Sequence, residues 1–153
     1  MKNFKKILII ILPLVILLAA FCFLRKSEKS VSDFDNFMSS RGLTCADTSN
    51  IVSDGELVTD AMIAVTDNYQ IEFYKSNSKD SAKQLFQTNV NSLNELIPSG
   101  KSKTRYFIGY KSFEIEDSKY YAKVIRVGQT YVYARVPIST KDDVKELLKE
   151  FNY

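Results

Sequence analysis

An apolar run near the N-terminus most constrains what this chain can fold into. Residues 7–24 carry no charge over 18 positions and are interrupted only by Pro13. As an α-helix this run would be about 27 Å long, close to the roughly 30 Å hydrocarbon core of a bilayer. Three lysines precede the run, and Arg25 and Lys26 follow it. This pattern predicts a transmembrane helix, which removes residues 1–26 from the globular fold.

Two other N-terminal signals compete with an uncleaved anchor. A secretory signal needs a small-x-small cleavage site, but Ala19 and Ala20 are followed by Phe21 and further bulky residues. A lipoprotein signal needs a small residue before the modified cysteine, and Phe21 occupies that position before Cys22. We therefore favour a single-pass signal anchor, with lipidation at Cys22 as the alternative. The basic N-terminal flank predicts that the N-terminus is cytoplasmic and the rest of the chain extracytoplasmic.

The charge of the chain divides between the anchor and the remainder. The whole sequence has a net charge of +3, from 21 Lys and Arg against 18 Asp and Glu. Residues 1–26 hold five of the positive charges and no negative one, so residues 27–153 are slightly acidic. A nucleic-acid partner, which requires a basic face on the folded domain, is therefore not predicted.

Composition also excludes several kinds of chemistry. The chain has no histidine, which removes Ser-His and Cys-His nucleophiles and histidine metal sites. Its two cysteines, Cys22 and Cys45, cannot make a disulfide framework or a zinc cluster. We interpret Cys45 as a partly buried thiol, with an intermolecular disulfide as the alternative. No metal and no cofactor are predicted.

The folded unit is expected over residues 31–153, after a short polar linker at residues 27–30. Apolar spacing predicts a helix capped by Ser32 and ended by Gly42, and a polar stretch with one short strand follows. A long helix is predicted over residues 78–97, and a last helix begins at Thr140.

Alternating residues predict the strands between these helices. Residues 61–74 read as a hairpin with a type I′ turn at Asp67-Asn68, and a helix over residues 56–64 is the alternative. Residues 105–136 read as three strands, the last two joined by a type II′ turn at Gly128. The order α-ββ-α-βββ-α predicts an α+β domain with a mostly antiparallel sheet and helices on one face.

One face of the predicted sheet is rich in tyrosine and arginine. All nine tyrosines follow residue 68, and the last two strands place five Tyr and Arg side chains together: Tyr120, Arg126, Tyr131, Tyr133 and Arg135. Tyrosine and arginine are enriched at binding surfaces, so these residues are the candidate binding site. The alternative is an ordinary exposed sheet face stabilised by cross-strand stacking.

A serine and a lysine form an enzyme-like motif. Ser76 and Lys79 have the Ser-x-x-Lys spacing in which a lysine accepts the proton of a nucleophilic serine. The companion segments of such enzymes are missing, and helix capping by Ser78 explains the same residues. A serine hydrolase therefore remains only an alternative to a non-enzymatic chain.

Three segments together resemble a known group of proteins. Residues 67–74 (DNYQIEFY), 125–133 (IRVGQTYVY) and 144–148 (VKELL) are similar to those of small surface lipoproteins and membrane-anchored proteins of Gram-positive bacteria. That resemblance implies a surface location and carries no assigned activity. We expect a membrane-anchored, non-enzymatic binding module for a protein or cell-envelope ligand. An accessory subunit of a membrane complex is the alternative.

Overall fold

The computed structural model describes residues 26–51 and 57–153. The predicted span at 7–24 and Cys22 therefore lie outside the described residues. Within those two ranges, none of the helices is both long and apolar enough to span a bilayer. The elements are, in chain order, α2 (Val31–Ser40), β1 (Thr44–Asp47), β2 (Val58–Val65), β3 (Gln70–Ser76), α3 (Lys79–Leu96), β4 (Lys101–Phe107), β5 (Tyr110–Glu116), β6 (Tyr120–Val127), β7 (Thr130–Pro137), the 3₁₀ turn η1 (Ile138–Thr140) and α4 (Lys141–Glu150).

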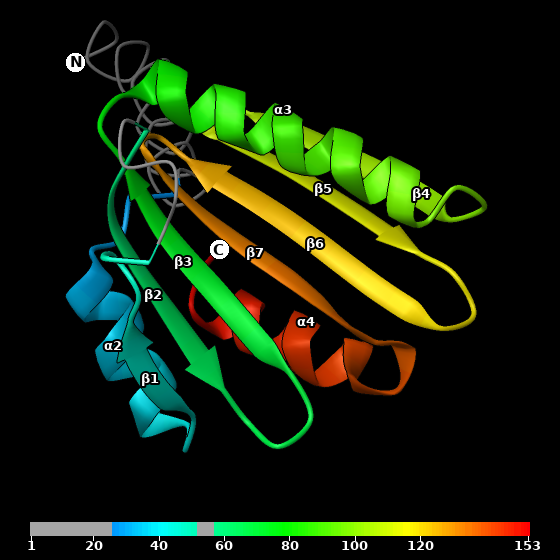
Figure 1. The fold of residues 1–153 in the computed structure, drawn as a ribbon, viewed down its shortest axis with the longest axis horizontal. Coiled ribbons are helices and arrows are strands. Elements are labelled where there is room, and N and C mark those ends of the chain that lie inside the picture. The colour runs from blue at the N-terminus through cyan, green and yellow to red at the C-terminus, as the bar shows by residue number, and fades with distance from the viewer. Residues whose placement is uncertain (1–25, 52–56) are drawn as a thin grey trace, which may run out of the picture.

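The strands form one antiparallel sheet in the order β1-β2-β3-β7-β6-β5-β4 (Figure 1). The α+β class and the antiparallel sheet are confirmed. The prediction of helices on one face is wrong, because α2 and α4 pack on one side and α3 packs on the other. The reason is visible in β6, where Val124 and Ile125 are both fully buried although they point to opposite faces. A strand that is apolar on both faces needs cover on both sides.

The two predicted hairpin registers are confirmed. Met62 faces Phe73 and Ala64 faces Ile71 in the first hairpin, so the alternative helix over this segment is wrong. The predicted type I′ turn is also wrong, because neither central residue has a positive φ. Instead the Thr66 hydroxyl accepts the backbone N–H groups of Asn68 and Tyr69, at 3.2 and 3.1 Å. This side chain supports the reversal without left-handed residues.

The second hairpin keeps both its predicted register and its predicted turn. Ile125 faces Val132 and Val127 faces Thr130. Gly128 has a φ of +58°, as the first central position of a type II′ turn requires.

The predicted single strand over residues 105–115 is in fact two strands. β4 and β5 are joined by a tight turn in which Gly109 has a φ of +74°. The sheet therefore has one strand more in this part than predicted, and all seven residues of β4 are exposed at the sheet edge. An exposed apolar residue, Ile108, precedes the glycine, and this conceals the turn from a prediction based on polarity.

Two of the predicted helix caps are misplaced. Ser30, not Ser32, caps α2, and its hydroxyl and Asp33 form a reciprocal capping box. Thr140 makes no capping bond to α4 and donates instead to the Pro137 carbonyl, because a 3₁₀ turn precedes the helix. The cap of α3 is as predicted, since the Ser78 hydroxyl accepts the Ser81 N–H.

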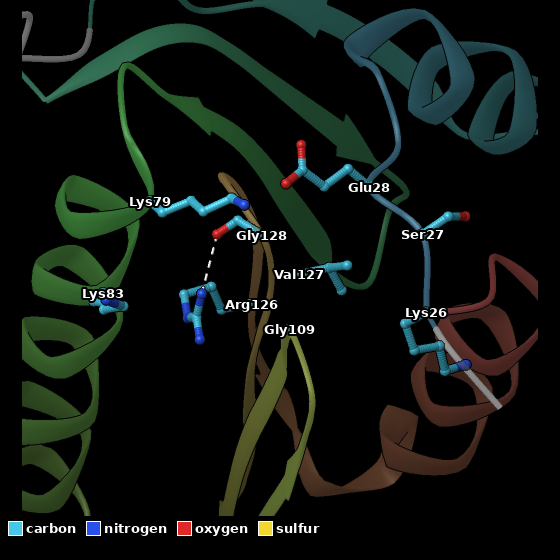
Figure 2. Close-up of a pocket in the computed structure, with 9 residues that line it drawn as sticks. All are labelled: Lys26, Ser27, Glu28, Lys79, Lys83, Gly109, Arg126, Val127 and Gly128. Carbon is cyan, nitrogen blue, oxygen red and sulfur yellow. Dashed lines mark hydrogen bonds between the residues drawn. The ribbon is translucent and has the colours of Figure 1, made fainter. Parts of the chain in front are cut away.

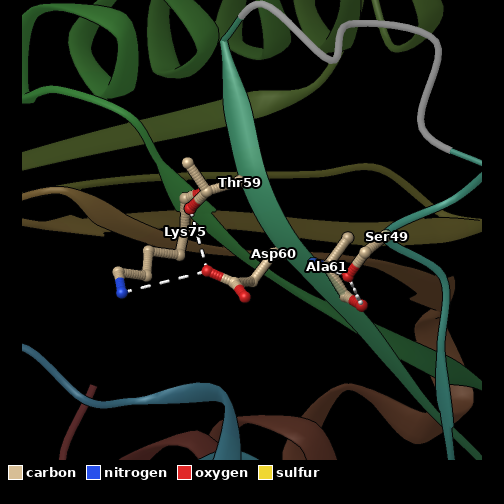
Figure 3. Close-up of polar contacts among 5 residues, drawn as sticks. All are labelled: Ser49, Thr59, Asp60, Ala61 and Lys75. Atoms are coloured by element: carbon tan, nitrogen blue, oxygen red, sulfur yellow. Dashed lines mark hydrogen bonds and ion pairs between the residues drawn. The ribbon is translucent and has the colours of Figure 1, made fainter.

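β2 has a bulge near its first residue, where it pairs with the last residues of β3. The register shifts between Val58 and Asp60, and the Thr59 hydroxyl donates to the Asp60 carboxylate and to the Lys75 carbonyl (Figure 3). Ser49 exchanges hydrogen bonds with the backbone of Ala61 and so holds the chain after β1 against β2. These contacts join the chain after β1 to β2, and β2 to β3, without a buried charge.

Candidate functional site

The predicted Tyr/Arg set does share one side of the sheet, but α3 covers much of that side. Tyr131 is only 4% exposed and packs in the core beneath α3, with its ring stacked on Tyr74 at 4.6 Å. Tyr133 is half-buried. The described residues therefore do not form an open Tyr/Arg face, because the long helix is placed on this side of the sheet.

The exposed members of the set lie apart from Arg126. The Arg135 guanidinium stacks over the Tyr120 ring at 4.6 Å, near the end of β6 where Tyr120 faces Pro137. Arg126 lies at the opposite end of β6, next to the Gly128 turn, and its side chain lines a pocket there. Arg126 faces Tyr131 across β6 and β7, as predicted, but α3 covers Tyr131. Tyr120 and Arg135 lie at the opposite end of the sheet.

The sheet has an entry end and a far end. The entry end is the row in which Phe107, Tyr110, Val127, Thr130 and Lys75 lie side by side across the strands. The far end carries the reversal after β2 and the reversal between β5 and β6. The first described residues, 26–30, run past the entry end, where the Glu28 carboxylate accepts the N–H of Gln129.

A pocket of about 710 Å³ opens at the entry end, and we call it the entry pocket (Figure 2). Residues from four separate segments of the chain meet there. Its lining is formed by Lys26, Ser27, Glu28, Lys79, Lys83, Gly109, Arg126, Val127 and Gly128. Four of these nine residues are cationic and one is acidic, so the pocket favours an anion.

Lys79 and Lys83 reach the pocket because they lie one turn apart on the first two turns of α3. Lys83 also contacts the exposed Asp80 carboxylate at 2.7 Å, and water competes for that ion pair. The N-terminal end of α3 adds its positive dipole end to the two lysines. The helix dipole and the two lysines therefore both attract an anion to this end of α3.

Arg126 is the most constrained cation in the entry pocket. Its Nη1 donates to the Gly128 carbonyl at 3.0 Å, as Figure 2 shows. Its Nε is buried and has no hydrogen-bond partner among the described residues. Burial lowers the pKa of Arg126, yet a guanidinium remains charged at neutral pH. The rest of the guanidinium is only partly buried, so an anion in the pocket would give it a charge-assisted partner.

Glu28 is the one acidic side chain in the lining, and Gly128 makes room for it. A Cβ at Gly128 would clash with the Glu28 carboxylate. The glycine thus serves both the positive φ of the turn and the close approach of Glu28.

A second pocket, of about 560 Å³, lies on the α4 side of the entry end, and we call it the α4 pocket. Five of its nine lining side chains are cationic: Lys26, Arg105, Lys123, Lys145 and Lys149. Glu146 is its one acidic side chain, and Phe107, Tyr110 and Tyr153 supply aromatic walls. Burial lowers the pKa of Lys123, and the nearby Glu114 carboxylate, 3.9 Å away, opposes that shift. Lys26 belongs to both pockets.

The structure does not assemble Ser76 and Lys79 into a hydrolase dyad. Ser76 is 1% exposed, and its Oγ has no hydrogen-bond partner among the described residues. A substrate cannot reach a nucleophile in that position, and within residues 26–51 and 57–153 no base accepts its proton. Cys45 is half-buried, and burial raises the pKa of its thiol, which lowers its reactivity.

Sequence reasoning missed the entry pocket. The two lysines after the Ser78 cap are visible in the sequence, but only the fold brings them to Arg126. The unrecognised turn at Gly109 completes the lining.

Comparison with known proteins gives the fold and no family. No family model matches the chain, and no curated protein matches it. Among solved structures, a GTP binding regulator from Thermotoga maritima is similar, with a TM-score of 0.50 and 10% sequence identity. The match covers 81% of this chain and 88% of that one. At this identity the similarity concerns the arrangement of strands and helices alone.

Proposed function

We propose that this chain is a membrane-anchored, extracytoplasmic binding module without enzymatic activity, and that the entry pocket holds an anionic, phosphate-bearing ligand. The observation that carries the proposal is the convergence of Lys79, Lys83 and Arg126 on one pocket beside the start of α3. The resemblance to membrane-anchored surface proteins and the apolar run at 7–24 support the location.

Phosphate suits this arrangement of donors. A guanidinium and two ammonium groups offer several charge-assisted hydrogen bonds, and a helix N-terminus adds a favourable dipole. A phosphate group carries the negative charge that this set of cations lacks, whereas a neutral ligand leaves the three cations without a counter-charge from the ligand. The cation set therefore favours phosphate over a neutral sugar or peptide.

The test is a titration of the full chain, in a non-ionic detergent, with pyrophosphate as the probe and phosphorus NMR as the readout. We expect saturable binding that the double variant Lys79→Gln/Lys83→Gln weakens at least about tenfold, roughly 1.4 kcal/mol. The matched control is Lys101→Gln/Lys103→Gln on the exposed strand β4, which removes the same charge outside the pocket. Equal weakening of pyrophosphate binding in both variants would show that binding depends only on the overall charge, and it would contradict a defined site.

A further inference from the structure

Three consecutive large side chains are exposed where β4 ends: Tyr106 and Phe107 are its last two residues, on opposite faces of the sheet, and Ile108 lies in the turn. Tyr106, Phe107 and Ile108 are 67%, 68% and 71% exposed. We call these residues the knuckle. Large apolar side chains are seldom gathered on a solvent-facing turn unless something covers them. Gly109 supplies the positive φ of the reversal, so the turn does not require a large apolar side chain at Phe107 or Ile108.

The knuckle lies where the chain enters the domain. Phe107 and Lys26 line the same α4 pocket, and the Gly109 carbonyl accepts the N–H of Gly128 at the entry end. Lys26 follows the predicted transmembrane run by two residues, which span at most about 7 Å when extended. Any bilayer that residues 7–24 cross must therefore lie close to the entry end.

Cationic side chains surround the knuckle. Arg105 precedes it on β4, and the Lys111 ammonium lies over the Tyr106 ring at 5.0 Å. Lys145 and Lys149 extend the positive charge along α4. Apolar and aromatic residues flanked by lysine and arginine match the two layers of a membrane surface, the acyl boundary and the anionic headgroups.

We infer that the knuckle contacts the surface of an anionic bilayer, the same bilayer that residues 7–24 are predicted to span. The Phe107 and Ile108 side chains enter the headgroup layer, and Arg105, Lys26 and Lys149 pair with anionic headgroups. The contact orients the domain so that both pockets open toward the membrane surface. This inference rests on the anchor in the proposed function and not on the identity of the ligand in the entry pocket.

The absence of tryptophan from the chain makes the contact measurable. Phe107→Trp introduces a single fluorophore into the knuckle, and Tyr120→Trp places one on the far end at a side chain that is 39% exposed. Each full-length variant is reconstituted into vesicles of phosphatidylglycerol and phosphatidylcholine, with or without brominated acyl chains. Circular dichroism confirms that both variants remain folded.

We expect the emission of Phe107→Trp to shift to shorter wavelength and to be quenched several-fold more by brominated lipid than that of Tyr120→Trp. Equal quenching at both positions, or none at Phe107→Trp, would overturn the contact. A blue shift without bromine quenching would assign the knuckle to a second copy of the chain, and this too would overturn it.

Vesicle flotation after an alkaline carbonate wash separates the two proposals. A chain that floats but shows no quenching at position 107 loses only the knuckle contact. A chain that does not float loses the anchor, and the knuckle contact fails with it.

Discussion

The two ends of the sheet solve the same problem, chain reversal, with different residues. At the far end, polar side chains make the turns: the Asp117 carboxylate accepts the N–H groups of Lys119 and Tyr120, at 2.8 and 2.7 Å. These backbone hydrogen bonds lower the pKa of Asp117. At the entry end, Gly109 and Gly128 make the turns through positive φ values. Side chains beside the Gly128 turn still bond the backbone, as Arg126 does to the Gly128 carbonyl and Thr130 to the Val127 carbonyl, but glycine makes the reversals themselves.

The two ends also differ in how their polar and charged side chains are paired. The far end uses its acidic groups locally, as with Glu116, which pairs with Lys141 at 2.6 Å. Both buried side-chain atoms that lack a partner among the described residues, Ser76 Oγ and Arg126 Nε, lie at the entry end. Unsatisfied buried polar atoms carry a cost in stability, and of the two residues only Arg126 lines the entry pocket.

The largest expected effect comes from removing the residue that ties the chain entry to the sheet. Tyr153 is 4% exposed, and its hydroxyl contacts Thr130 and the N–H of Lys29. Tyr153→Ala should lower the unfolding free energy by about 3–5 kcal/mol, because it leaves a cavity and frees the entry segment. Tyr120→Ala at the far end should cost less than about 1 kcal/mol. Urea unfolding of the full chain in detergent, followed by circular dichroism, measures both, and similar values would erase the difference between the ends.

High pH should weaken the entry end next. Burial raises the pKa of Tyr153 from 10.0 to about 12. The folded protein holds this proton more tightly than the unfolded chain, so the stabilisation is complete below pH 10 and is lost as the pH rises toward 12. The loss should reach about 2 to 3 kcal/mol for this residue. Burial also raises the pKa of Tyr74 and Tyr121, which adds loss of the same sign.

The contribution of Tyr153 is isolated by Tyr153→Phe, which should flatten the fall in stability above pH 10. Tyr120→Phe, on a more exposed ring, controls for loss of any hydroxyl. An unchanged slope in Tyr153→Phe would contradict the assigned burial.

The local parts of the fold could be predicted because they depend on neighbouring residues. The pairing of Ala64 with Ile71 follows from alternation around a turn, and the Ser78 cap follows from a polar residue before an amphipathic helix. The side of the sheet on which α3 packs could not be predicted in this way. It depends on the second apolar face of β6, and the alternation of residues does not show which helix covers that face.

The candidate site depends on contacts between distant segments, so its assembly could not be predicted. The sequence indicates Arg126 as a binding residue but predicts an open tyrosine face around it. In the structure Tyr131 is stacked under α3, and the neighbours of Arg126 in the pocket come from residues 26–28 and from Lys79 and Lys83. No periodic pattern links positions that far apart in sequence.

A smaller effect of opposite sign is expected at the unsatisfied serine. Ser76→Ala should raise the unfolding free energy by about 1 kcal/mol, since it removes a buried hydroxyl without a partner. The matched change Thr130→Val removes a hydroxyl that donates to the Val127 carbonyl at 2.9 Å and also contacts the Tyr153 hydroxyl, so it should cost about 1 to 2 kcal/mol. Thermal unfolding distinguishes the two, and destabilisation by both variants would contradict the unpaired state of Ser76.

The smallest effect is expected at the far end. Lys141→Gln breaks the ion pair with Glu116. The Lys141 side chain is 25% exposed and that of Glu116 is 35% exposed, so the loss of unfolding free energy should be at most about 1 kcal/mol. The difference from the parent chain should shrink at about 1 M salt, because screening weakens a partly exposed pair. A loss that persists at high salt would indicate a packing role for the Lys141 stem instead.

The central claim is that residues 7–24 hold the chain in a membrane with the domain outside. Fractionation of bacterial cells that express the full chain, with protease shaving and intact-mass measurement, tests it most directly. We predict an unmodified, uncleaved chain of 153 residues that only detergent extracts from the membrane fraction, and a domain that external protease removes from cells stripped of their wall. A chain released by alkaline carbonate, or one whose domain is protected until the cells are lysed, would contradict the account.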